Sequence, residues 1–105
     1  MQPEKITIMT KAEVIEILRR ERPYLEKECG VKTLLLFGSA ARDQMTENSD
    51  VDLLVEFTGP ATSKQYFAAQ FRLEDALGKA VDLISLKSVK PRLRSSIEKD
   101  AVVVE

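Results

Sequence analysis

The sequence contains no histidine and only one cysteine, and both absences exclude kinds of chemistry. Without histidine there can be no histidine general base, no Ser-His-Asp triad and no histidine-ligated zinc. A catalytic base or metal ligand must therefore be a carboxylate, and carboxylate oxygens suit Mg²⁺ or Mn²⁺. Because Cys29 is alone, no internal disulfide can form, and we expect a reducing compartment. We interpret Cys29 itself as an inert residue at a helix end.

Long hydrophobic runs and a strong net charge are also missing. No apolar run approaches the roughly 18–20 residues of a membrane-spanning helix, and the start, MQPEKITIM, lacks the basic and apolar regions of a signal peptide. We therefore expect no membrane partner and a cytoplasmic location. The formal net charge of −1 does not favour a nucleic-acid partner. The 105 residues suit a single domain over 1–105.

The predicted elements alternate between helix and strand. A T-x-x-E capping box at Thr10 and Glu13 predicts a helix over 11–28 that ends at Gly30, and Pro23 favours a break near Arg22. Strands are expected at 31–37, 51–57 and 79–86, a short helix after residue 39, and further helices at 63–77 and 91–99. The helix at 63–77 has residues 66, 67, 71, 73 and 77 on its apolar side. The tail at 101–104 is a small strand or a docking segment. This order predicts an α/β (α+β) class, with a small mixed β-sheet and flanking helices.

The stretch 34–57, LLLFGSAARDQMTENSDVDLLVEF, holds most of the residues that point to chemistry. It is typical of a strand, a tight turn, a short connection and a second strand. Gly38 lets a ligand approach the backbone because it has no Cβ, and Ser39 adds a hydroxyl and an N–H. Alone, this pair would indicate an ordinary turn. Asp50 and Asp52, at i and i+2 on a strand, point to one face and repel each other unless a cation lies between them.

Asp82 is a third carboxylate, inside the apolar strand AVDLI, where an isolated charge is costly to bury. If this strand lies beside that of Asp50 and Asp52, the three carboxylates form an oxygen site for one or two Mg²⁺ ions. The alternative is that these aspartates are solvated residues at strand borders. The metal-site hypothesis predicts in-line attack of an acceptor hydroxyl on a nucleotide α-phosphorus, with Gly38 and Ser39 at the outer phosphates.

The basic residues near these motifs have two interpretations each. Arg42 forms a surface ion pair with Asp43 or Glu47, or it clamps nucleotide phosphates, whose oxygens match its planar donors. A basic cluster further along is a solvated helix face, or a contact surface for an acidic partner, RNA or triphosphate. The basic cluster consists of Lys87, Lys90, Arg92 and Arg94.

The segments GSAAR, SDVDLLVEF and VDLISL resemble the motifs of minimal nucleotidyltransferases, the MNT family of the DNA polymerase beta-like superfamily. The resemblance covers most of the chain and implies a polymerase-beta-like nucleotidyltransferase palm fold. It also implies Mg²⁺ binding by Asp50, Asp52 and Asp82, and contact of Gly38 and Ser39 with a nucleoside triphosphate. One departure is residue 43, an aspartate where many members of the family place glycine.

The same resemblance implies a partner. Family members of this size are commonly paired with a small helical HEPN toxin, so the chain is expected to be an antitoxin that transfers AMP from ATP to a tyrosine hydroxyl of that toxin. The short chain favours a protein acceptor, because little remains to enclose a small substrate. Two alternatives stay open: a non-catalytic antitoxin that neutralises its partner by complex formation, and nucleotidyl transfer to a small molecule or an RNA end. A homodimer or hetero-oligomer is compatible with an apolar helix face.

Overall fold

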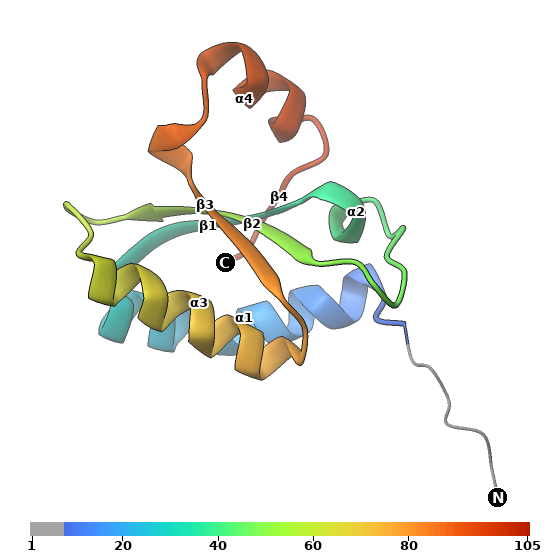
Figure 1. Cartoon of the computed structure of the whole chain (residues 1–105), viewed down its shortest axis with the longest axis horizontal. Coiled ribbons are helices and arrows are strands. Elements are labelled where there is room, and N and C mark those ends of the chain that lie inside the picture. Colours follow the sequence, from blue (N-terminus) through green and yellow to red (C-terminus); the bar gives the residue numbers. More distant parts are fainter. Residues whose placement is uncertain (1–7) are drawn as a thin grey trace, which may run out of the picture.

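The computed structural model describes residues 8–105 and shows a four-stranded sheet with helices on both faces (Figure 1). Residues 1–7, which hold most of the segment that we compared with a signal peptide, lie outside the described residues. The elements are α1 (Lys11–Cys29), β1 (Val31–Phe37), α2 (Gly38–Ala41), β2 (Val51–Phe57), α3 (Ser63–Leu77), β3 (Val81–Ser85), the single-turn helix η1 (Leu86–Ser88), α4 (Pro91–Glu98) and β4 (Val102–Val103). This confirms the predicted mixed class. No helix within residues 8–105 has the length and apolar character needed to cross a membrane.

The sheet has the strand order β3-β2-β1-β4. β2 runs antiparallel to β1 and parallel to β3, and in the parallel pair Asp52 lies opposite Asp82. The C-terminal tail is a strand, because Val102 and Val103 pair antiparallel with β1. The third predicted strand, 79–86, is shorter than expected, because η1 already begins at Leu86. The chemistry-bearing ends of β2 and β3 therefore lie side by side.

Side-chain alternation along the two central strands divides the core into two clusters. Leu36 and Leu53 belong to the larger cluster, which α1 and α3 cover from one side of the sheet (Figure 1). Leu35 and Leu54 belong to the smaller cluster on the opposite face, below α4. Because side chains two residues apart on a strand share a face, Asp52 lies on the same face as Leu54. The acidic residues therefore face away from the layer of α1 and α3.

The break expected near Arg22 is wrong, because α1 continues through Pro23. Proline removes a backbone hydrogen bond, but here its ring lies on the exposed side of the helix. Leu18 and Leu25 are fully buried on either side of it and anchor both halves of α1 in the core. Arg22 adds a further tie, since its Nε donates to the carbonyl oxygen of Val104 at 3.1 Å.

The face of α3 that packs on the sheet agrees with the predicted one in part: Leu73 and Leu77 are buried as expected, but Phe67 and Phe71 are not. Ala69 and Leu73 are buried, whereas the side chains of Phe67 and Phe71 are 51% and 64% exposed. The two phenylalanine rings stack on each other outside the core, with 6.2 Å between their centroids. At 100° per residue, these rings lie almost opposite Ala69 on the helix. The small side chain of Ala69 lets the helix approach the sheet, which a pattern weighted toward large apolar residues does not detect.

Candidate active site

Gly38 is in direct contact with Asp52. Its backbone has φ +74°, and a Cβ atom added there would lie 2.2 Å from Oδ2 of Asp52. This distance is far below any van der Waals contact, so a side chain at position 38 would displace the carboxylate. Glycine is therefore required for two reasons at this position: the left-handed backbone and the close approach of an acidic group.

The short helix expected after residue 39 is present as α2, but it already begins at Gly38 and therefore includes Gly38 and Ser39. Ala40 and Ala41 are buried in the larger core cluster, which fixes this four-residue helix against the sheet. The carbonyl oxygen of Ser39 accepts a hydrogen bond from the backbone N–H of Gln44 at 2.8 Å. The Gly-Ser turn is thus fixed by the packing of α2 against the core and by a backbone hydrogen bond to Ser39.

The structure brings the three aspartates to one end of β2 and β3. Asp52 and Asp82 are register partners on adjacent parallel strands, which lie about 4.8 Å apart. Asp52 is half-buried and Asp82 is exposed. Asp50 lies just before β2, where it lines a shallow pocket of about 190 Å³ together with Lys79. The backbone N–H of Val51 donates to the carbonyl of Ala80 at 3.0 Å, which ties the beginnings of the two strands together.

The electrostatics of Asp52 reflect this arrangement. Burial raises the pKa of Asp52 above the ordinary aspartate value, and the neighbouring carboxylate of Asp82 raises it further, with a smaller contribution from Asp50. The guanidinium of Arg42 acts in the opposite direction and lowers the pKa of Asp52. Two negative neighbours outweigh one positive one, so the site favours a cation beside Asp52.

Within residues 8–105, no three Asp, Glu or Cys side chains converge closely enough to enclose a metal ion as they stand. The carboxylates of Asp82 and Asp50 nevertheless lie close enough to raise the pKa of Asp52. The oxygen atoms of these three carboxylates are the ligands that Mg²⁺ prefers. The donor set therefore fits a hard divalent cation.

Arg42 does not form the local ion pairs considered from the sequence. Its guanidinium lies 3.8 Å from the carboxylate of Asp100 and donates to the side chain of Gln44 at 3.2 Å. Both partners of the ion pair are about half exposed, so their interaction is weak. Asp43 takes a different role: it adopts φ 57°, and its carboxylate accepts a hydrogen bond from the N–H of Lys11 at 2.7 Å. Arg42 thus remains free to exchange a weak partner for a stronger one.

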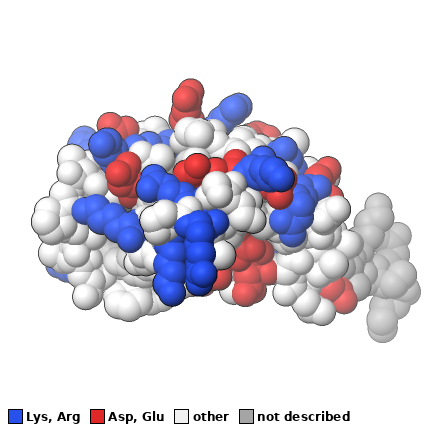
Figure 2. All heavy atoms as spheres, turned by 90° about the horizontal axis from the view of Figure 1, so that it is seen from above, with Lys and Arg blue, Asp and Glu red and all other residues white. Residues whose placement is uncertain are grey.

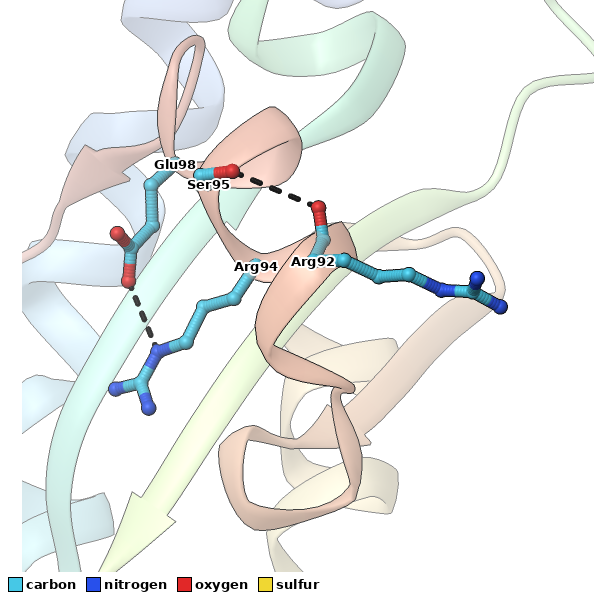
Figure 3. Close-up of polar contacts among 4 residues, drawn as sticks. All are labelled: Arg92, Arg94, Ser95 and Glu98. Carbon is cyan, nitrogen blue, oxygen red and sulfur yellow. Dashed lines mark hydrogen bonds and ion pairs between the residues drawn. The ribbon is translucent and has the colours of Figure 1, made fainter.

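The basic cluster (Lys87, Lys90, Arg92 and Arg94) is exposed on η1, on α4 and just before α4. Arg94 donates to Glu98 at 3.0 Å, whereas the side chain of Arg92 extends away from that pair (Figure 3). Figure 2 shows that acidic side chains lie among the basic ones on this face of the molecule. The surface is therefore of mixed charge, as expected for a solvated helix face.

The larger of the two cavities described here, with a volume of about 460 Å³, lies at the opposite end of β2 from Asp50 and Asp52. Phe57 and Phe67 form part of its wall, and Lys87 of the basic cluster lies at it. None of the six residues proposed from the sequence lines this cavity. The predicted site is thus an open surface beside α2, not an enclosed pocket.

Sequence reasoning missed two sets of residues around the site. Asp100, the partner of Arg42, is far away along the chain and leaves no local signal. Three polar side chains of α3 contact the backbone of β3 on both sides of Asp82: Tyr66, Gln70 and Glu74. Their spacing of i, i+4, i+8 was a readable signal, because it places them along one line of a helix.

Comparisons with known proteins agree with this site. Over residues 20–105 the chain matches the family described as Polymerase beta, Nucleotidyltransferase. "Putative protein adenylyltransferase MJ0128" of Methanocaldococcus jannaschii is 38% identical over 96 residues, covering 90% of this chain and 98% of that protein. Protein adenylyltransferase MntA of Thermococcus cleftensis is 30% identical over 99 residues, covering 94% and 100% of the two chains.

Solved structures share the fold. A structure described as a "putative minimal nucleotidyltransferase" has a TM-score of 0.70 and 34% identity, and the match covers 84% of this chain and 93% of that one. A toxin–antitoxin structure with AMP-PNP has a TM-score of 0.67 and 21% identity, with coverage of 83% and 72%, which shows the fold alone. The family match and the close relatives together show that this chain belongs to the polymerase beta nucleotidyltransferase family and is a nucleotidyltransferase.

Proposed function

We propose that this chain is a Mg²⁺-dependent protein adenylyltransferase that transfers AMP from ATP to a tyrosine hydroxyl of a HEPN-type toxin, and thereby acts as its antitoxin. The observation that carries the proposal is the pairing of Asp52 with Asp82 across parallel strands, beside the Gly38 turn. The names of the relatives, protein adenylyltransferases, support the reaction type. A fold neighbour at 18% identity, a tri-AMPylated Shewanella oneidensis HEPN toxin in complex with MNT antitoxin, suggests the kind of acceptor.

The nucleotide would bind with its outer phosphates at the Gly38-Ser39 turn. Backbone N–H groups and the hydroxyl of Ser39 supply neutral donors there. Arg42 would exchange Asp100 for phosphate oxygens, since its present ion pair is long and exposed. This exchange would bring a planar, permanently charged donor to the phosphates.

Asp50, Asp52 and Asp82 would hold Mg²⁺, because their oxygens are the ligands that this cation prefers. When bound, Mg²⁺ neutralises phosphate charge and lowers the pKa of a coordinated hydroxyl. The contact between Gly38 and Asp52 fixes the position of one of these carboxylates relative to the phosphate turn. The chain thus sets the distance between the phosphate-binding turn and the acidic residues through a single backbone position.

The reaction that follows is an in-line displacement. The tyrosine oxygen forms a bond to the α-phosphorus of ATP, and the bond from that phosphorus to the α–β bridging oxygen breaks. Pyrophosphate leaves with the electron pair, and the hydroxyl proton passes to the carboxylate of Asp82, which is exposed at the strand edge. An exposed Asp82 on an open surface suits an acceptor hydroxyl that belongs to another protein, because the surface of that protein would cover the site during the reaction.

The test is intact-mass spectrometry of a HEPN-type protein incubated with the chain, ATP and Mg²⁺. We expect the mass of one or more AMP groups to be added, and peptide mapping to place them on tyrosine. Asp52→Asn should abolish the added mass, and Asp75→Asn, a change on the exposed side of α3, should not. Transfer by Asp52→Asn at the wild-type rate would reject the proposal.

A parallel growth assay separates catalysis from simple binding. If the antitoxin acts by adenylylation, Asp52→Asn fails to protect cells from the toxin even though the two proteins still copurify. Protection by a variant that transfers no AMP would favour the non-catalytic antitoxin instead. Labelling of an RNA end or a small molecule in the absence of any protein acceptor would favour the remaining alternative.

A further inference from the structure

The outer edge of β3 is bound by side chains of α3. The hydroxyl of Tyr66 donates to the carbonyl of Leu83, and the amide of Gln70 donates to the carbonyl of Val81 at 3.2 Å. The carboxylate of Glu74 accepts from the N–H of Val81 at 3.0 Å. β3 is the edge strand of the sheet, so these backbone groups have no neighbouring strand to bond. We call Tyr66, Gln70 and Glu74 the edge clamp.

The edge clamp bonds to the backbone of the two residues next to Asp82 in the sequence. Val81 precedes Asp82 and Leu83 follows it, and both bond to the clamp. Successive residues of a strand direct their backbone groups to opposite sides, so those of Asp82 point the other way, toward β2. The backbone is therefore held from α3 on one side and from β2 on the other, and Asp82 lies at the point where the two meet.

The side chain of Asp82 depends on this backbone support. It is exposed, and no ion pair within residues 8–105 holds it. β3 is only five residues long and has a single neighbouring strand, β2. Short edge strands open locally at low free-energy cost when few bonds hold them. The position of the Asp82 carboxylate relative to Asp52 is then set by how firmly β3 is attached to α3.

We propose that the edge clamp consists of positioning residues that hold Asp82 in register with Asp52 for metal binding and transfer. The role assigned to Asp82 rests on the proposed function, but the clamp itself rests on three hydrogen bonds to the backbone on both sides of that residue. α3 thus contributes to the active site from the opposite face of the sheet, without any of its side chains touching the substrate.

The test compares variants that lose a single clamp bond. Tyr66→Phe removes the hydroxyl and keeps the ring, and Glu74→Leu removes the acceptor for Val81. Glu74→Gln restores an acceptor oxygen of the same length and should rescue the loss. Ala68→Gly is the matched control, because it weakens the same helix at an exposed position that lies away from β3.

Two readouts are needed, and the first does not depend on activity. Binding of Mn²⁺ without nucleotide, followed by electron paramagnetic resonance, should weaken by about tenfold in Glu74→Leu, as residues that orient metal ligands do. In the transfer assay, kcat should fall on the order of tenfold while KM for ATP changes by less than about twofold, because the displaced group acts on the acceptor side. Glu74→Gln and Ala68→Gly should resemble wild type in both.

The outcomes separate the two proposals. Wild-type Mn²⁺ affinity and kcat in both Tyr66→Phe and Glu74→Leu would overturn the positioning role, and so would equal losses in Ala68→Gly. If Glu74→Leu does not fold, Tyr66→Phe alone decides the result, since it removes a single oxygen atom. Weakened Mn²⁺ binding in the variants of a chain that transfers no AMP would reject the proposed function but support the clamp.

Discussion

The replacement of Gly38 by alanine tests whether the Gly-Ser turn sets the position of Asp52. The added Cβ would lie 2.2 Å from Oδ2 of Asp52, so the carboxylate must move by about 1 Å to reach an ordinary contact distance. A displacement of that size in a catalytic group can lower the rate by roughly 100-fold. We therefore expect Gly38→Ala to reduce the rate of AMP transfer by about two orders of magnitude.

The same substitution also strains the backbone, and this effect has to be measured separately. Alanine in the left-handed region costs about 1–2 kcal/mol, partly offset by the lower entropy of its unfolded chain. Gly78 provides the matched control, because its φ is +67° and an added Cβ would meet nothing within 4 Å. Gly78→Ala should therefore lose a similar amount of stability, about 4–8 °C in Tm per kcal/mol, without loss of transfer.

The comparison of the two variants decides the question. Thermal melts by circular dichroism give the loss of stability, and initial rates at a temperature well below both midpoints give the effect on transfer. If Gly38→Ala and Gly78→Ala lost activity to the same extent, the contact with Asp52 would have no special role. The loss would then reflect stability alone, and our account of the turn would be refuted.

Two further predictions concern charge and backbone conformation near the site. Because burial and Asp82 raise the pKa of Asp52 on folding, ionisation of this carboxyl costs stability as the pH rises above the ordinary aspartate value of 3.8. Metal-free Asp52→Asn should therefore melt at a higher temperature than wild type at pH 7, and the difference should vanish in a pH series down to about 4. An unchanged Tm at pH 7 would contradict this. Asp43 combines φ 57° with a hydrogen bond from the N–H of Lys11, so Asp43→Ala should lower the free energy of unfolding in urea by about 1–2 kcal/mol. Asp43→Asn should lower it much less, because asparagine tolerates this conformation and keeps an acceptor oxygen. Equal losses of stability in the two variants would argue against the role of the backbone.

Much of the fold could be predicted because its boundaries are set by local chemistry. The capping box at Thr10 begins α1, and the left-handed Gly30 and Gly78 end α1 and α3, where the sequence indicates, since these signals act within a few residues. Pro23 was misleading because the outcome there depends on tertiary packing and not on local chemistry. Its local cost is real, but the burial of Leu18 before it and Leu25 after it outweighs that cost.

The site residues could be predicted because they lie on or next to strands, where a polar residue or a glycine beside an apolar run is visible in the sequence. Gly38, Ser39, Asp50, Asp52 and Asp82 were named from their positions, and the structure brings them to one end of β2 and β3. The metal and phosphate roles of these residues stay predictions. The direct contact of Gly38 with Asp52 could not be derived, because it depends on the antiparallel register between β1 and β2, which only the folded sheet fixes.

Other contacts around the site could not be predicted, since they depend on which segments distant in sequence meet. Arg42 meets Asp100 because β4 returns the chain to β1, and nothing near residue 42 signals this. Phe67 and Phe71 were placed on the apolar side of the helix from the periodic pattern, and the structure exposes both. A periodic pattern identifies a helix, but the choice of buried stripe is made by whatever fits closely against the sheet.

The two edges of the sheet limit how this protein can assemble with others. On one side, α3 already occupies three outward-facing backbone groups of β3, and on the other side β4 is only two residues long. Within the described residues, neither edge offers a long row of free N–H and C=O groups on which a strand of another chain could grow. A complex with a partner, or with a second copy, would therefore have to form through side chains, and its specificity would depend on individual surface residues. The same two features would also hinder the edge-to-edge stacking of strands that begins many forms of aggregation.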